Sequence, residues 1–142
     1  MKEKVLAVLI TALIVSSIPC FAFAVSETDI PISDEKSLEY THASTVSSTL
    51  IISDSGKAKP AAVIMGLPGG TTKLSVTMYL QRYLNGVWET VQKWSKSTTA
   101  NHLSISKNKV VTKGRYRTHS VFKAYSNSKV ERIEKNSKSV SY

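Results

Sequence analysis

Residues 72–82 read TKLSVTMYLQR and decide the class of fold that the sequence predicts. Apolar and polar side chains alternate without a break along this stretch, and the apolar ones are Leu74, Val76, Met78 and Leu80. A period of two places successive side chains on opposite faces of an extended strand, so that one face is buried and the other is solvated. The stretch therefore predicts a half-buried β-strand.

Turn residues on both sides of this strand divide the chain into further short extended runs. Clusters of Gly, Asn, Asp, Ser and Pro at 54–56, 67–70, 84–86 and 126–128 are typical of β-turns. The runs between them are residues 50–53, 57–66, 87–95, 101–106, 115–125 and a final strand drawn from 130–142. No long window after residue 24 has helical periodicity. The pattern predicts an all-β fold, an Ig-like antiparallel β-sandwich of about seven strands.

Single residues refine this expectation at three places. Pro60 lies inside a candidate strand and cannot donate a ladder hydrogen bond, so we expect a sheet edge or a bulge there. Val91 has the opposite parity to Trp88 and Trp94, which indicates a bulge or a contact on both faces. Tyr116 follows a Gly-Arg pair at the start of a long strand, where Ig-like sandwiches place a tyrosine corner. The alternative for this tyrosine is an ordinary position at the margin of the core.

Stability must come from the two inner faces, because the single cysteine, Cys20, lies in the N-terminal apolar stretch and no disulfide is expected in the folded part. The same absence excludes a thiol nucleophile and a cysteine-based zinc site. The predicted core is Leu50, Ile52, Ile64, Leu74, Val76, Met78, Leu80, Trp88, Trp94, Leu103, Ile105, Tyr116 and Phe122.

The N-terminus has the pattern of a secretory signal peptide. A basic start precedes the apolar residues 5–18, and the small residues of Ala22-Phe23-Ala24 predict cleavage after Ala24. An uncleaved anchor is one alternative, and lipid modification of Cys20 is another, although Pro19 fits a lipobox poorly. We therefore expect a helical signal peptide at 1–24, an acidic flexible leader at 25–47, and the β-sandwich domain at 48–142.

Charge is spread unevenly along the 142 residues, whose formal net charge is +9. Five of the six charged residues in 25–39 are acidic, whereas residues 40–142 hold sixteen basic and four acidic residues. The acidic stretch is typical of a solvated linker, and an acidic pro-segment is the alternative. The basic body is expected to attract polyanions, unless its charge serves solubility alone.

Three segments carry a resemblance to a known family. They are TMYLQRYLNGVWETVQKW at 77–94, KGRYR at 113–117 and KAYS at 123–126. Together they resemble a family of small secreted proteins of Gram-positive bacteria that is known only as a domain of unknown function, and the resemblance covers most of residues 45–142. It implies an exported Ig-like domain and supplies no catalytic residues. Thr118 and Ser120 depart from the family, which has aliphatic residues at these inner-face positions.

Catalytic chemistry finds little support in the folded region. A hydrolase needs a nucleophile with a base or a pair of carboxylates on one rigid face, and zinc needs three or four convergent ligands. The folded region has four carboxylates, Asp54, Glu89, Glu131 and Glu134, and the two that are close in sequence, Glu131 and Glu134, have opposite parity in a strand. The three histidines, His42, His102 and His119, are widely separated. The region has neither a Gly-x-Ser-x-Gly elbow nor a phosphate-binding loop. We expect no enzyme, no cofactor, no metal and no catalytic residues.

A candidate binding face follows from the expected topology. In an Ig-like sandwich, strand 72–82 lies antiparallel beside strand 115–125, so their outward side chains combine into one surface. Aromatic rings on this surface could stack on sugars or bases while its cations hold phosphate. The alternative is an ordinary exposed β-face. The candidate binding residues are Lys73, Tyr79, Gln81, Arg117, His119, Lys123 and Tyr125.

The sequence thus predicts a secreted, non-catalytic β-sandwich that is extracellular or associated with the cell surface. It would serve as a binding or structural module of the cell envelope, and its expected partner is an anionic cell-wall polymer or another extracellular polyanion. The alternative is a toxin-like or antimicrobial effector that acts on other cells. No specific nucleic-acid partner and no transmembrane segment in the mature chain are expected, and the oligomeric state is left open.

Overall fold

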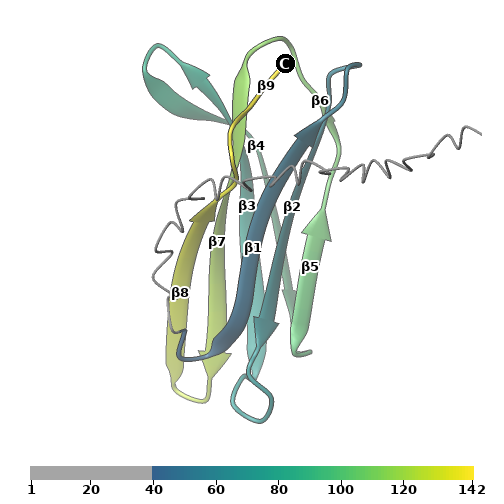
Figure 1. Ribbon diagram of the computed structural model, residues 1–142. Helices are drawn as coiled ribbons and strands as arrows, with labels where there is room; N and C mark the ends of the chain where they lie inside the picture. The colour runs from purple at the N-terminus through teal and green to yellow at the C-terminus, as the bar shows by residue number, and fades with distance from the viewer. Residues whose placement is uncertain (1–39) are drawn as a thin grey trace, which may run out of the picture. The chain divides into compact units, whose positions relative to one another are not determined.

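The computed structural model describes residues 40–142, which form nine β-strands and no helix (Figure 1). The strands are β1 (Ala43–Ile52), β2 (Lys57–Gly66), β3 (Lys73–Leu84), β4 (Val87–Thr98), β5 (His102–Ser106), β6 (Lys109–Val110), β7 (Arg115–Ser126), β8 (Lys129–Asn136) and β9 (Val140–Ser141). Turn chemistry explains several boundaries. Asn85 and Gly86 both have positive φ, 50° and 84°, between β3 and β4. A two-residue turn of this kind matches the twist of the strands that it joins.

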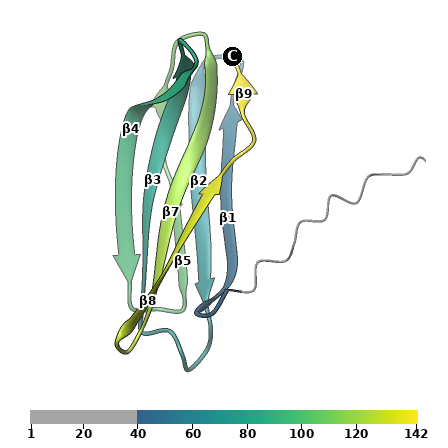
Figure 2. The same ribbon diagram turned by 90° about the vertical axis from the view of Figure 1, so that its left-hand side faces the viewer.

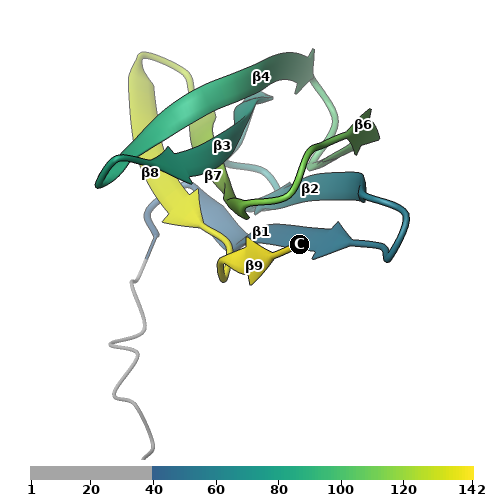
Figure 3. The ribbon, with the colours of Figure 1, turned by 90° about the horizontal axis from the view of Figure 1, so that it is seen from above.

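The strands form two antiparallel sheets. One has the order β1–β2–β5 with β6 also paired to β2, and the other has the order β4–β3–β7–β8 with β9 also paired to β7. In the lettering of Ig domains this is A-B-E facing C′-C-F-G, so the predicted all-β, Ig-like sandwich is confirmed. Figures 2 and 3 show the two layers from the side and from above. The two-residue strands β6 and β9 account for the difference between nine strands and the seven expected.

The core lies between the sheets in two clusters. The larger one contains Ala43, Val46, Ala62, Ile64, Leu74, Val76, Met78, Leu103, Ile105, Phe122, Ala124 and Ile133. The smaller one contains Leu50, Ala58, Leu80, Val111 and Tyr116, with Ile52 packed against it, and Trp94 contacts both clusters. All but one of the predicted core residues therefore lie in or against the core, and the small residues Ala43, Ala58, Ala62 and Ala124 were not predicted.

Two buried hydroxyls belong to the β7 positions where the resemblance implies aliphatic residues. Thr118 and Ser120 are both 0% exposed. The Ser120 Oγ lies 2.9 Å from the Oγ of Ser48 on β1. Ser120 therefore bridges the two sheets with a hydrogen bond instead of an apolar contact, whereas the Thr118 hydroxyl has no hydrogen-bond partner.

The tyrosine corner expected at Tyr116 is present. Tyr116 is 2% exposed, and its hydroxyl donates a hydrogen bond of 2.8 Å to the carbonyl of Thr112, four residues upstream. The bond joins the start of β7 to the loop that precedes it, as in other Ig-like sandwiches.

Three expectations need correction. β1 begins at Ala43, so residues 43–47 belong to the sheet and not to the leader expected over 25–47.

Pro60 lies in the central strand β2 and not at a sheet edge. Its carbonyl accepts from Lys107 N, but it has no N–H to donate back, and the ladder is interrupted opposite it, between β5 and β6. Trp88, which was expected in the core, lies on the outer face of its sheet, where it pairs with Tyr83. The signal peptide, its cleavage after Ala24 and the leader up to residue 39 lie outside the described residues.

Candidate binding face

The outer face of the β4–β3–β7–β8 sheet, hereafter the basic face, contains all seven candidate binding residues. Cross-strand pairing joins Tyr79 to His119 and Gln81 to Arg117. The same register pairs Lys73 with Tyr125 and Ser75 with Lys123. Directly opposed residues of an antiparallel pair share one face, so the predicted placement of these side chains on a single surface is confirmed.

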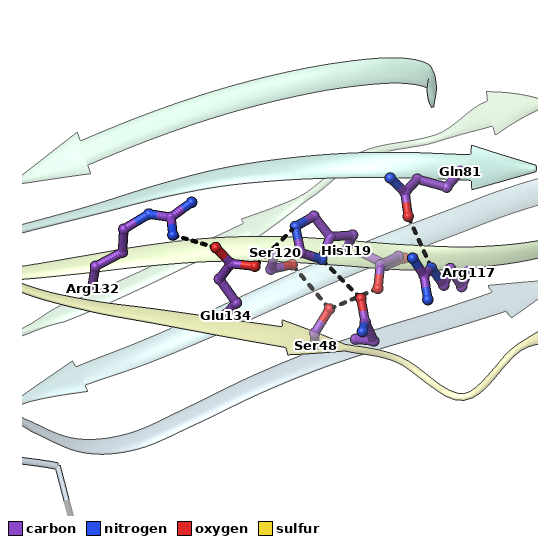
Figure 4. A network of polar contacts seen from close by, with 9 residues as sticks. Ser48, Gln81, Arg117, His119, Ser120, Arg132 and Glu134 are labelled. Atoms are coloured by element: carbon purple, nitrogen blue, oxygen red, sulfur yellow. Dashed lines mark hydrogen bonds and ion pairs between the residues drawn. The ribbon is translucent and has the colours of Figure 1, made fainter. Parts of the chain in front are cut away.

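Positive charge dominates the basic face. The register of the sheet places six cationic side chains there, against the single carboxylate of Glu134. The six are Lys73, Lys93, Arg115, Arg117, Lys123 and Arg132. Glu134 forms an ion pair with Arg132, and its other oxygen lies 3.7 Å from Nε2 of His119 (Figure 4). The remaining five cations have no ion-pair partner among residues 40–142, so their charge is not neutralised within the described chain.

Each of the four aromatic rings on this face has a cation over it. Lys73 Nζ lies 5.4 Å from the centroid of Tyr125, and Lys93 Nζ lies 5.7 Å from that of Tyr79. The guanidinium carbon of Arg115 lies 5.7 Å from the centroid of Tyr83. Arg117 and Arg115 lie 4.4 Å and 5.9 Å from the ring of Trp88. These are cation–π distances, so each of these rings is in contact with a cation and helps to orient it.

Trp88, Arg115 and Arg117 form the Arg–Trp cluster at the β3–β4 hairpin end of the face. Arg117 Nε donates to Gln81 Oε1 at 2.8 Å, as Figure 4 shows. Arg115 donates from Nε and Nη2 to Ser139 Oγ at 3.1 Å and 2.9 Å. Partial burial lowers the pKa of the Arg117 guanidinium from its ordinary value, although arginine remains charged at physiological pH. Both guanidinium groups are thus held in place before any ligand arrives.

A β-bulge brings Trp88 to this face. The ladder between β3 and β4 passes from Leu80–Gln92 to Gln81–Thr90, so Val91 is an extra residue. Trp94 pairs with Met78 on the inner face, whereas Trp88 pairs with Tyr83 on the outer face, with ring centroids 5.0 Å apart. The expected bulge at Val91 is therefore confirmed, and the expected burial of Trp88 is wrong because an extra residue reverses the parity of a strand.

His119 is held in place by contacts with side chains on the two neighbouring strands, β3 and β8. Its Nδ1 lies 2.8 Å from Asn136 Oδ1, and its ring centroid lies 5.7 Å from that of Tyr79. With Nε2 facing Glu134, both ring nitrogens have neighbours on β8. The imidazole therefore ties β7 to β8 and supports the middle of the basic face.

A shallow hydroxyl-lined hollow lies between β3 and β4, towards the end of the face opposite the Arg–Trp cluster. Ser75, Thr77, Ser95 and Ser97 line it beside Lys73. Ser95 Oγ donates to Thr77 Oγ1 at 3.2 Å. The hollow offers polar hydrogen-bonding groups next to a cation.

Sequence reasoning missed five residues of the basic face: Tyr83, Trp88, Lys93, Arg115 and Arg132. Two of them lie on β4, which the sequence-based surface did not include, and one lies on β8. The off-parity position of Val91 was the available signal for Trp88. Arg115 belongs to the same parity as Arg117 and could have been included directly.

No group of three or more His, Cys, Asp and Glu side chains that could hold a metal ion occurs within residues 40–142. Glu131 is used structurally, since its two carboxylate oxygens accept from the backbone N–H groups of Thr41 and His42 at 2.8 Å and 2.6 Å. No helix in the described part of the chain is long and apolar enough to span a membrane.

The strand order and the tyrosine corner define the chain as an Ig-like β-sandwich with one strongly basic, aromatic sheet face. No protein-family model matches the sequence, and no curated protein matches it. Among solved structures, the chain is similar to the CARDB domain of a Pyrococcus furiosus protein, crystallised in complex with di-metal ions. Identity is 16%, coverage is 69% of this chain and 90% of that chain, and the TM-score is 0.37. The assignment of the fold rests on the register of the chain itself.

Proposed function

We propose that this protein is an exported, non-catalytic module that binds an anionic polymer of the cell envelope through its basic face. The observation that carries the proposal is the gathering of six cations against one carboxylate on one sheet face. Surfaces with one sign of charge raise the local concentration of polyions of the opposite sign. Export is proposed from the N-terminal pattern of residues 1–24.

The shape of the basic face suits a polymer better than a small molecule. The face is an open sheet and not an enclosed pocket, and its cations are distributed from Lys73 at one end of β3 to Arg115 beside Tyr83 at the other. Ten residue steps of a strand span about 33 Å. An extended chain with an anion in each repeating unit could contact several of these cations at once, and many weak contacts then add to useful affinity.

The decisive experiment compares two variants with equal loss of formal charge. Arg117→Ser, His119→Ser and Lys123→Ser are combined to remove two charges and a histidine from the basic face. The control combines Lys57→Ser with Lys59→Ser, which removes two charges from exposed positions on the other sheet. Retention of purified protein on cell-wall fractions is measured from low to high salt.

The basic-face variant should bind about tenfold more weakly and show a flatter salt dependence, because fewer counterions are released on binding. The control should bind like the unsubstituted protein. Unchanged retention of the basic-face variant would remove the proposal, because the face would then take no part in binding. An equal loss in both variants would also remove it, because net charge and not the face would then govern retention.

A further inference from the structure

The Arg–Trp cluster differs from the other cations of the basic face in how firmly its charges are fixed. Arg117 is held by Gln81 and stacked on Trp88, and Arg115 is held by Ser139 while it lies over Trp88 and Tyr83. The lysines of the face are exposed and rest on flexible stems. Fixed groups lose less side-chain entropy when a ligand binds, so these two arginines are the best-organised cations on the face.

Hydrogen-bonding capacity remains available at both arginines. The contacts above use Nε of Arg117 and Nε with Nη2 of Arg115, so both terminal nitrogens of Arg117 and one of Arg115 have no partner among residues 40–142. Neither side chain forms an ion pair with a carboxylate of the described chain. Each guanidinium carbon lies within 6 Å of the same ring centroid, which brings two forks of donors close to one place.

The geometry favours a tetrahedral anion over a planar one. A carboxylate lies flat against one guanidinium fork and satisfies it. A phosphodiester directs its oxygens out of one plane and can therefore accept hydrogen bonds from two forks that start at different strand positions. Arg115 and Arg117 are two residues apart on β7, about 7 Å along the strand, a separation that one phosphate group and its ester oxygens can bridge.

The aromatic rings distinguish among phosphodiester polymers. Nucleic-acid bases bind such faces by stacking on open rings, but each of the four rings here already has a cation over it. The hollow lined by Ser75, Thr77, Ser95 and Ser97 instead offers hydrogen bonds to hydroxyl groups. Polyol or sugar units carry such hydroxyls between their phosphates.

We propose, on the basis of the function proposed above, that the Arg–Trp cluster is a phosphodiester-selective subsite for a polyol phosphate polymer. The cluster holds the phosphate, and the hydroxyl-lined hollow at the opposite end of the face contacts polyol hydroxyls of another repeating unit. The remaining cations provide attraction without selectivity.

The test uses a charge-preserving variant, Arg115→Lys with Arg117→Lys. A synthetic glycerol phosphate oligomer is compared with a carboxylate polymer, polyglutamate, of equal charge number, and with a single-stranded oligonucleotide. The unsubstituted protein should bind the glycerol phosphate oligomer about tenfold more tightly than polyglutamate, and the lysine variant should lose this preference because ammonium groups lack the planar fork. Overall binding at low salt should persist in the variant.

A second measurement is independent of the variant's folding. Titration of the unsubstituted protein with the glycerol phosphate oligomer should shift the indole N–H resonance of Trp88 and leave that of Trp94, on the inner face, in place. Equal binding of phosphate and carboxylate polymers, an unchanged preference in the lysine variant, or a silent Trp88 would overturn the subsite while leaving the basic face as a binder. Tighter binding of the oligonucleotide would favour nucleic acid instead. If no polymer binds at all, the function proposed above fails as well.

Discussion

Tyr116 stabilises the start of β7 through a part-buried hydrogen bond from its hydroxyl to the carbonyl of Thr112. Removing the hydroxyl with Tyr116→Phe leaves this carbonyl without its donor, and we expect a loss of about 1–3 kcal/mol in the free energy of unfolding. Urea unfolding measures it. Tyr83→Phe, at a ring that is 40% exposed, is the matched control and should change stability by less than about 0.5 kcal/mol. Equal effects of the two substitutions would contradict a special role for the corner.

Thr118 presents the opposite case, a buried hydroxyl without a partner. The residue is 0% exposed, and its Oγ1 has no hydrogen bond. Thr118→Val replaces this hydroxyl with a methyl group of similar shape, so we expect a gain of about 1–2 kcal/mol. Ser120→Ala should instead lose stability, because it breaks the contact with Ser48. A loss of stability in Thr118→Val would mean that the hydroxyl is satisfied by an internal water molecule.

Residue-level expectations succeeded where local chemistry decides the outcome. The Gly-Arg-Tyr start of β7 was sufficient to predict the corner, because the motif depends on residues close in sequence. The sequence could not reveal that Ser120 meets Ser48, which lies seventy-two residues away on the other sheet. Contacts between the sheets depend on the position and angle at which one sheet packs on the other, and the alternation of apolar and polar residues does not specify this packing.

The β-bulge at Val91 shows how one residue changes what a whole strand presents. Trp88 and Trp94 share a parity in the sequence, yet they lie on opposite faces because the extra residue lies between them. Alternation predicted the strand, and the off-parity valine predicted the irregularity. The direction in which the bulge sends the tryptophan depends on the cross-strand register, which is fixed by the Asn85–Gly86 turn.

Deleting Val91 should leave every other pair of the β3–β4 ladder in place, because Gln92 and Thr90 then follow each other opposite Leu80 and Gln81. We expect Trp88 to stay on the basic face and stability to change by less than about 1 kcal/mol. Inserting one alanine after Val91 adds a second extra residue, which must either reverse the face of Trp88 or widen the bulge. We expect this insertion to abolish the polymer binding proposed above.

Fluorescence of Trp88 in a Trp94→Phe background checks both variants, because an outward indole is open to a water-soluble quencher. Urea unfolding gives the accompanying change in stability. If the deletion hides Trp88 from the quencher, the register set by the Asn85–Gly86 turn does not fix the face of the ring. Unchanged exposure after the insertion would mean that the bulge has widened instead.

The charge arrangement of the whole molecule could be anticipated only in part. The sequence predicted the excess of basic residues over 40–142 and the alignment of β3 with β7. It did not predict that β4 and β8 extend the same surface through Lys93 and Arg132, since their outward parity depends on the bulge and on the register of β8. Composition thus predicts the sign of the protein's charge, and the topology determines on which face the positive charge gathers.

Crowding of like charge on one face should make the stability of the molecule depend on salt. Neighbouring cations, such as Arg115 with Arg117 along β7 and Lys123 directly opposite Arg132, start from strand positions closer than the screening length of about 10 Å at 0.1 M salt, so they repel one another in the folded state. Raising the sodium chloride concentration from 0.05 M to 0.5 M should therefore stabilise the protein by about 1 kcal/mol, which corresponds to a few degrees in Tm. Thermal unfolding followed by circular dichroism measures this effect.

Combining Lys73→Gln, Lys93→Gln and Lys123→Gln should reduce the salt-dependent rise in Tm and raise Tm at low salt. The matched control combines Lys57→Gln, Lys59→Gln and Lys107→Gln, exposed positions away from the basic face. Its salt dependence should resemble that of the unsubstituted protein. The same slope in both variants would show that repulsion follows net charge and is not concentrated on this face. A smaller slope in the first variant alone means that the repulsion is concentrated on the basic face, where a bound anionic polymer would be expected to relieve it and so to stabilise the folded protein.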